Sequence, residues 1–270
     1  MSKEKERKFK KDEFYGWRAG EAWAHDYVRT CQVAVENEEV FSVFKSTPAF
    51  QTILEHVPVQ LGQSYITNVA NNNPKLLKKL QQFADGNDSV GTPLVHKIDN
   101  NFNVVMSPTT ARYIKVLSDL RTAFGSLQGY NIVEIGGGYG GLCKVISLEE
   151  DFANYYDVDL DEPLALAAKY ASTTGINNFN PVKIEDLEKL ENVEIDLVIS
   201  NYAFSECNYE TQDVYIDKIL SKAKRGYLTH NTAPERQSRT ESKICEYENF
   251  KIFGEDLCRK KHKIYTWGGE

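Results

Sequence analysis

Apolar residues recur at helical spacing through the first half of the chain. Three segments there begin with a polar residue followed by proline, at Thr47-Pro48, Asn73-Pro74 and Ser107-Pro108. Such polar side chains accept hydrogen bonds from the free N–H groups of a helix start, and proline is tolerated at the first helical position. Each pair therefore predicts an amphipathic helix, and residues 11–31 fit a further one. Residues 85–106, rich in Gly, Asn and Asp, are expected to form a loop with a short hairpin.

Helical and strand patterns alternate from residue 126 onward. The expected helices cover residues 141–147, 163–171 and 209–225. The expected strands cover residues 131–135, 154–160, 181–184, 195–200, 226–229, 250–253 and 262–267. This alternation favours a mostly parallel sheet covered by helices, with the last two strands as an antiparallel pair. We therefore predict an α/β fold with a helical region over residues 1–125 and a sheet domain over residues 126–270.

The strand at 131–135 runs directly into a glycine-rich turn that precedes a helix. Glycines allow a tight turn and let the backbone approach a ligand closely, so this arrangement is typical of nucleotide-binding sites. Gly136, Gly138 and Gly141 fit the dinucleotide pattern G-x-G-x-x-G, whereas Gly136, Gly138 and Gly140 fit G-x-G-x-G. The spacing alone leaves both cofactor classes open, together with a turn that binds nothing.

Glu134 lies two residues before the first glycine and favours the second pattern. A carboxylate at this position suits a ligand that carries an ammonium and a sulfonium group, and it does not suit a pyrophosphate. The glycine motif also follows a long helical region, and the last strand pair would complete a seven-stranded sheet of the methyltransferase type. These features predict S-adenosyl-L-methionine (SAM) as the cofactor of a Rossmann-like domain.

Further polar residues follow the neighbouring strands. Asp157 and Asp159 lie on one side of their strand, about 20 residues after the glycines, where Rossmann-like folds place an acid on the cofactor ribose. Asp159 is nearer the carboxyl end, so we assign the ribose to it, with Leu160 beside it in the cofactor site. Asp186 is assigned to the adenine amino group or, alternatively, to a solvated loop, and Asn201 is expected to line the pocket.

Several stretches of the chain resemble the sugar O-methyltransferase family, within the class I SAM-dependent enzymes. The stretches that carry the resemblance are residues 53–57, 107–113, 132–142, 159–163 and 199–206. The resemblance implies a seven-stranded Rossmann-like sheet, a helical lid over the active site, and a sugar hydroxyl of a glycan or nucleotide sugar as the acceptor. The alternatives are a SAM-dependent enzyme with a non-sugar acceptor, an NAD(P)-binding oxidoreductase, and a non-catalytic binding module.

Methyl transfer to a sugar hydroxyl requires a base, because a hydroxyl is a poor nucleophile at neutral pH. Ligands of open α/β sheets bind beyond the carboxyl ends of the strands, and the segments that leave the fourth and fifth strands contain Glu206 and His230. We take His230 first and Glu206 second as the catalytic base, with His56 and His96 of the helical region next in order. Arg112 is expected to bind the cofactor carboxylate, a sugar phosphate, or a surface acid.

Composition limits the partners of the protein. A net charge of −7 does not suit a nucleic-acid or anionic-membrane binder, so we expect a carbohydrate substrate and no nucleic acid. Five cysteines without a Cys-x-x-Cys pair are typical of reduced thiols in a cytoplasmic protein. No apolar run reaches the roughly 18 residues of a membrane span. The strand ends offer Asn201, His230 and Asn231 but no carboxylate suited to Mg²⁺, so we expect no metal.

Overall fold

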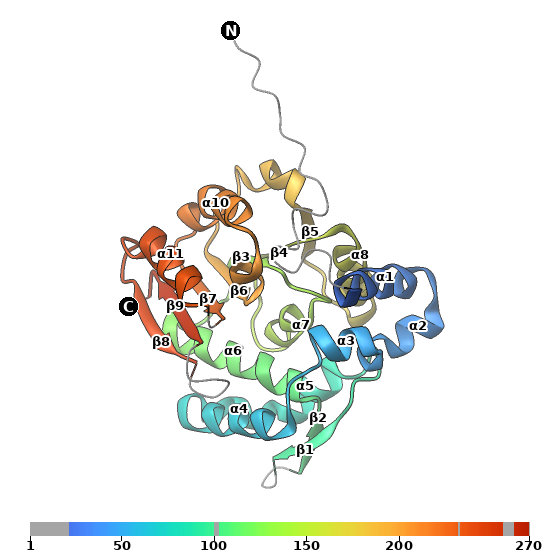
Figure 1. Ribbon diagram of the computed structural model, residues 1–270. Helices are drawn as coiled ribbons and strands as arrows, with labels where there is room; N and C mark the ends of the chain where they lie inside the picture. The colour runs from blue at the N-terminus through green and yellow to red at the C-terminus, as the bar shows by residue number, and fades with distance from the viewer. Residues whose placement is uncertain (1–21, 100–102, 232, 256–261, 270) are drawn as a thin grey trace.

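The computed structural model describes residues 22–99, 103–231, 233–255 and 262–269 (Figure 1). The elements before the main sheet, with η for a short 3₁₀ helix, are α1 (Ala22–Glu36), α2 (Glu38–Val43), η3 (Phe44–Ser46), α3 (Pro48–Ile53), α4 (Val59–Asn72), η4 (Pro74–Lys79), α5 (Leu80–Asn87), β1 (His96–Asp99), β2 (Val104–Met106) and α6 (Pro108–Phe124). The remaining elements are β3 (Asn131–Ile135), α7 (Gly141–Ser147), β4 (Asn154–Asp159), α8 (Asp161–Thr174), β5 (Phe179–Lys183), η5 (Ile184–Leu190), β6 (Leu197–Asn201), α9 (Ala203–Glu206), α10 (Tyr209–Lys218), η6 (Leu220–Lys222), β7 (Gly226–His230), α11 (Pro234–Ile244), β8 (Lys251–Gly254) and β9 (Lys263–Trp267).

Seven strands of the described residues form one sheet in the order β5-β4-β3-β6-β7-β9-β8. The strands from β5 to β7 run parallel, whereas β9 is antiparallel to both β7 and β8. The strand order reverses between β3 and β6, and open α/β sheets bind ligands at the carboxyl ends of the strands beside such a point. This topology confirms the predicted fold, a Rossmann-like seven-stranded methyltransferase sheet with an amino-terminal helical extension.

The two faces of the sheet have different neighbours because successive side chains of a strand alternate in direction. On one face, Ile132 of β3 and Ile199 of β6 share a buried core with α6, α7 and α8. On the other face, Val133 of β3 and Leu228 of β7 share a second core with α10 and α11. Two residues near neighbouring strand ends can therefore meet only if their side chains point to the same face of the sheet.

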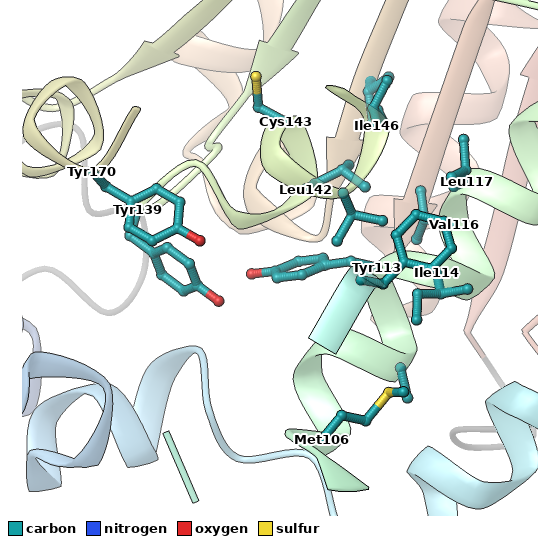
Figure 2. Close-up of a cluster of buried hydrophobic side chains, with 14 of the residues drawn as sticks. Met106, Tyr113, Ile114, Val116, Leu117, Tyr139, Leu142, Cys143, Ile146 and Tyr170 are labelled. Atoms are coloured by element: carbon teal, nitrogen blue, oxygen red, sulfur yellow. The ribbon is translucent and has the colours of Figure 1, made fainter. Parts of the chain in front are cut away.

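The helical extension packs on α6, α7 and α8, with α4 against α6 and α1 against α8. Figure 2 shows side chains of α6 meeting those of α7, with Tyr113, Tyr139 and Tyr170 gathered nearby. The ring centroids of Tyr139 and Tyr170 are 5.2 Å apart, and the buried ammonium of Lys45 lies 4.4 Å from the Tyr139 ring centroid. One hydrophobic core thus spans residues on both sides of position 125.

Two of the three predicted helix starts form as expected. Thr47 and Ser107 accept hydrogen bonds from Phe50 N and Thr109 N. Asn73 does not cap η4, because its side chain instead donates hydrogen bonds to Ser118 and Thr122 on α6. A long-range contact therefore replaced the local cap, and the first turn became a 3₁₀ helix.

Other elements differ in extent from the prediction. The helix expected over residues 209–225 is divided into α10 and η6 at Ile219, whose φ and ψ of −123° and −61° are not helical. Of the helix expected over 11–31, the described part begins at Ala22. The short hairpin expected within residues 85–106 forms as β1–β2. Helices α2, α4, α9 and α11 are additions to the predicted set.

No helix among the described residues has the length and apolar character to cross a membrane. The described cysteines are free thiols, with Cys31 and Cys143 buried, Cys207 half-buried and Cys245 exposed.

Candidate functional site

Three glycines give the loop after β3 its shape. Gly136, Gly138 and Gly140 have φ angles of 77°, 64° and 84°, which other L-residues rarely adopt. A Cβ atom at Gly138 would lie 2.9 Å from Leu54 Cδ1, and one at Gly136 would lie 2.1 Å from Ala203 Cβ. The loop is therefore held closely between the helical extension and the segment that follows β6.

Two aspartates of β4 support this loop. Asp157 is fully buried and accepts a hydrogen bond from Gly137 N at 3.0 Å. Asp159 is half-buried and accepts hydrogen bonds from Gly138 N at 3.2 Å and Leu160 N at 2.8 Å. Burial raises the pKa of Asp157 well above its ordinary value and raises that of Asp159 to about 6. Asp157 supports the loop, whereas Asp159 keeps the exposure that contact with a ligand requires.

Glu134 is a buried carboxylate at the carboxyl end of β3, with 2% of its surface exposed. Tyr155 Oη donates a hydrogen bond to Glu134 Oε2 at 2.6 Å. Burial raises the pKa of Glu134 to about 7, although the Tyr155 hydrogen bond acts in the opposite direction. A carboxylate removed from water in this way is stabilised in its charged form by a nearby cation.

Arg112 supplies a guanidinium group near Glu134 from the second turn of α6. Its guanidinium carbon lies 5.5 Å from the Tyr113 ring centroid. Burial opposes its charge, but Tyr113, Tyr202 and Tyr65 raise the pKa of Arg112 above the ordinary value. The assignment of Arg112 to the cofactor carboxylate, a sugar phosphate or a surface acid stays a prediction. The group is half-buried and faces aromatic side chains.

Asn201 ends β6 directly beside β3. Thr229 Oγ1 donates a hydrogen bond to Asn201 Oδ1 at 3.2 Å. The buried Nδ2 atom of Asn201 faces Glu134, and it makes no hydrogen bond of normal geometry in the described part of the chain. A buried amide N–H without an acceptor is costly, and such a group is a candidate for ligand binding.

Tyr202 adopts a strained backbone conformation, with φ 71° and ψ −37°. Non-glycine residues held in sparsely populated backbone regions cluster at functional sites. Its hydroxyl lies 3.3 Å from His262 Nδ1, and the two rings are 5.3 Å apart in an edge-on arrangement. His262 precedes β9, more than fifty residues away in sequence, so no local pattern around the glycine loop could have selected it.

His230, the first choice of catalytic base, lies apart from these residues. Its imidazole is fully buried, with Nε2 3.0 Å from Thr240 Oγ1 and Nδ1 3.2 Å from Asn231 O. Burial lowers the pKa of His230 to about 4. Strand β7 extends through residue 230, so alternation turns His230 toward α11 and Tyr265 while Thr229 faces Asn201. Both ring nitrogens of His230 therefore have protein partners.

The remaining candidates lie at the edges of the site. Glu206 is half-buried at the end of α9, four residues after Tyr202. Asp186 follows β5 and forms an ion pair with Lys189 at 2.7 Å. His56 and His96 are both exposed, His56 after α3 and His96 on the β1–β2 hairpin.

The helical extension covers the glycine loop. The residues that make these contacts are not among the predicted catalytic or cofactor-binding residues. Glu55 accepts hydrogen bonds from Tyr139 Oη at 3.0 Å and from Ser107 Oγ at 2.8 Å. Thr109 Oγ1 donates to Leu54 O at 3.1 Å, which holds Leu54 over Gly138. Residues 53–57 and 107–113, two of the stretches that carry the family resemblance, therefore contact each other beside the glycine loop.

A metal would need a cluster of suitable side chains. Among the residues that the structure describes, no group of three or more His, Cys, Asp or Glu side chains is placed to hold one.

The chain matches no protein-family model and no curated protein. Among solved structures, it is similar to a SAM-dependent methyltransferase from Aquifex aeolicus, at 17% identity over 57% of this chain and 87% of that chain, with a TM-score of 0.41. An rRNA methylase from Streptococcus thermophilus gives 16% identity over 52% of this chain and 87% of that chain, with a TM-score of 0.41. TrmK from M. capricolum, in complex with S-adenosylhomocysteine, gives 16% identity, coverage of 56% and 66%, and a TM-score of 0.40. The fold assignment rests on the strand order of the sheet rather than on these similarities.

Proposed function

We propose that the chain is a SAM-dependent methyltransferase. The observation that carries this proposal is the buried carboxylate of Glu134 at the end of β3, with Arg112 and the unsatisfied Asn201 amide nearby. An amino-acid group, which bears both an ammonium and a carboxylate, matches these opposite charges. A pyrophosphate next to Glu134 would instead meet a like charge, so a dinucleotide cofactor fits less well.

The proposal assigns each part of the cofactor to particular residues. Glu134 binds the ammonium group and Arg112 binds the carboxylate. Asp159 accepts hydrogen bonds from the ribose, beside Leu160 and the turn formed by Gly136, Gly138 and Gly140. Asp186 lies beyond β5, where its carboxylate would accept the adenine amino group once the Lys189 ion pair opens. Asn201 closes the site next to Glu134.

Bound SAM supplies a methyl group on a positively charged sulfur, so the protein must position the acceptor and remove its proton. We propose His262 as the base, because an imidazole is the side chain most often used for this step and Tyr202 orients it. Glu206 is the second candidate, since it leaves the same strand end as Tyr202. His230 is replaced in this role, because both of its ring nitrogens have protein partners.

The acceptor is proposed to be a sugar hydroxyl of a glycan or nucleotide sugar. The support is the resemblance at residues 53–57, 107–113 and 199–206, which meet around the site, together with a net charge of −7 that opposes binding to a polyanion. The reduced thiols agree with a cytoplasmic setting. A SAM-dependent enzyme with a non-sugar acceptor is the alternative.

Calorimetry of the full chain with S-adenosylhomocysteine and, separately, with NADH tests the cofactor. We expect saturable binding of S-adenosylhomocysteine, at least tenfold weaker binding in Glu134→Gln, and no binding of NADH. The control is Glu185→Gln, an exposed carboxylate on η5 beside Asp186. NADH binding without S-adenosylhomocysteine binding would replace the proposal with the oxidoreductase alternative.

The acceptor is tested by the formation of S-adenosylhomocysteine during incubation with SAM. The assay uses a panel of nucleotide sugars and neutral glycans, with small-molecule phenols and RNA as comparison acceptors. Turnover that depends on a saccharide supports the sugar assignment. Turnover only with a comparison acceptor would keep the methyltransferase proposal and reject the sugar.

A further inference from the structure

A pocket of about 630 Å³ with a mixed polar and apolar lining lies between α4, α6 and strands β7 to β9. Its wall comes from both halves of the chain, with Asn68 and Asn72 on α4, Lys115 and Asp119 on α6, and residues of the last two strands. Among the described residues, none of the glycines of the loop after β3 lines it. The pocket is therefore separate from the proposed cofactor site.

Glu255 provides an unsatisfied hydrogen-bond acceptor in this pocket. The side chain is 4% exposed, and its Oε2 atom accepts a hydrogen bond from Lys115 Nζ at 2.6 Å. Its Oε1 atom is buried and has no hydrogen-bond partner among the residues that the structure describes. Leaving a buried acceptor unpaired costs free energy, so a ligand that donates a hydrogen bond there would recover it.

Lys115 and Asp119, two of the other charged groups of the pocket, are already paired. Lys115 Nζ also lies 2.7 Å from Asp119 Oδ2, and Tyr227 Oη donates a hydrogen bond to the same oxygen at 2.6 Å. Two lysines and two acids line the pocket, Lys115 and Lys251 against Asp119 and Glu255, so their formal charges cancel. A strongly charged ligand therefore gains no net attraction here.

The uncharged part of the lining favours hydroxyl groups. Asn68, Asn72 and Asn249 supply amides, and Thr122 and Thr266 supply hydroxyls. Phe253 also lines the pocket and is 48% exposed, so an apolar face is offered beside the polar groups. A neutral ring compound with many hydroxyls presents both kinds of surface at once.

The pocket adjoins the proposed site of methyl transfer. Glu255 N donates a hydrogen bond at 2.9 Å to the backbone carbonyl of His262, whose side chain contacts Tyr202. On α6, Lys115 follows Arg112 by three residues. Burial raises the pKa of Glu255 above its ordinary value, and the charges of Lys115 and Arg112 act in the opposite direction. Residues three apart on a helix are neighbours on its surface.

We propose that this pocket binds a neutral, hydroxyl-rich group such as a saccharide unit, which belongs to the part of the acceptor that is not methylated. Glu255 Oε1 accepts a hydrogen bond from a ligand hydroxyl, and Phe253 packs against the apolar face of the ring. The role of the pocket in catalysis rests on the proposed function, whereas the binding of a saccharide to the pocket does not. The pocket would hold one part of the acceptor in place, so that the reactive hydroxyl of the acceptor lies near Tyr202 and His262.

The test measures binding of the full chain to an immobilised array of neutral and acidic oligosaccharides. The variant Asn72→Trp fills the pocket from the exposed end of α4, and Asn71→Trp adds the same bulk at a neighbouring exposed position outside it. We expect retention of neutral oligosaccharides by the parent and by Asn71→Trp, and at least tenfold weaker retention by Asn72→Trp. Glu255→Gln, which keeps the side-chain volume but presents an amide to Lys115 and the pocket, should weaken retention to a similar extent.

Three results would overturn the proposal: no retained neutral oligosaccharide, retention of acidic ones only, or equal retention by Asn72→Trp and the parent. Calorimetry with S-adenosylhomocysteine on the same samples separates this inference from the proposed function. Cofactor binding without saccharide binding rejects the pocket alone. Saccharide binding without cofactor binding rejects the methyltransferase and leaves the pocket as a binding site.

Discussion

The charge state of Glu134 depends on what lies beside it. In the structure, burial favours the protonated acid, and Tyr155 is a neutral donor that compensates only in part. An ammonium group in the site would favour the carboxylate. Protonation of this one residue and binding of the cofactor are therefore coupled.

The affinity for S-adenosylhomocysteine should rise with pH. With a pKa of about 7 in the free protein, Glu134 is mostly protonated at pH 6.5 and mostly ionised at pH 8. If only the ionised form binds, affinity increases roughly fourfold over this interval, because affinity follows the ionised fraction. Asp159, with a pKa of about 6, is largely ionised across the same interval and adds little.

Calorimetry at the two pH values measures this change. In Glu134→Gln the affinity should be low and nearly independent of pH between them. An affinity of the parent that stays constant or falls as the pH rises would contradict the assignment of Glu134 to the ammonium group.

The two histidines at the ends of β7 and β9 should respond differently to substitution. His262→Gln removes the proposed base, so turnover should fall at least about 100-fold with little change in cofactor affinity. Tyr202→Phe removes only the hydroxyl that orients His262, and it should lower turnover less while shifting the pH–rate profile. His230→Gln should unfold at a lower temperature than the parent, because it disturbs the buried contact to Thr240, but keep turnover within about threefold.

Steady-state kinetics at saturating SAM and acceptor, across pH 5.5 to 9, provide the measurement. A large loss of turnover in folded His230→Gln together with parental turnover in His262→Gln would restore the sequence-based choice. If neither variant lost turnover, Glu206 would become the candidate base.

At the scale of elements, strand β4 illustrates how one strand serves two purposes. Its alternate residues Tyr155, Asp157 and Asp159 point to the same face, toward β3 and the glycine loop. Exposure increases along that row, since Tyr155 and Asp157 are fully buried and Asp159 is half-buried. The first two positions therefore support the loop, and the last one is available to a ligand.

Substitution of the two aspartates should separate these roles. Asp159→Asn removes a charged acceptor from the ribose position and should weaken S-adenosylhomocysteine binding by about 10- to 100-fold with little loss of stability. Asp157→Asn preserves the shape and the acceptor for Gly137 N, and it removes a buried acid whose raised pKa disfavours its charge. Its cofactor affinity should stay within about threefold of the parent. Calorimetry and thermal unfolding of both variants check this, and the reverse order of affinities would assign the ribose to Asp157.

At the scale of the whole molecule, the helical extension and the sheet do not have separate cores. Glu55 is bonded to Tyr139 of the glycine loop, and the buried side chain of Asn87 donates a hydrogen bond to Thr110 and accepts one from Tyr170. Lys45 places its buried ammonium over the Tyr139 and Tyr170 rings. The predicted boundary at 125/126 therefore marks a change of secondary structure, while packing continues across it.

The full chain should unfold in one cooperative transition. A fragment of residues 126–270 would expose Tyr139, Tyr170 and the face of α7 that α6 covers, so it should lack a sharp thermal transition and bind a hydrophobic dye. Circular dichroism and calorimetry of the chain and the fragment provide the comparison. A fragment that melts cooperatively near the parental temperature would show that the sheet domain is independent.

The sequence by itself determined the features that depend on local periodicity and on glycine. The strand at Asn131–Ile135, the turn after it, the helix at Gly141–Ser147 and the acids that end β4 follow from neighbouring residues, and the structure has them at the predicted positions. Tertiary structure decided which side chains meet across the sheet. The strand predicted to end at Thr229 continues through His230. Because side chains alternate along a strand, His230 points away from the side on which Thr229 meets Asn201. His262 reaches Tyr202 because β9 pairs with β7, a contact between distant segments that no local pattern encodes.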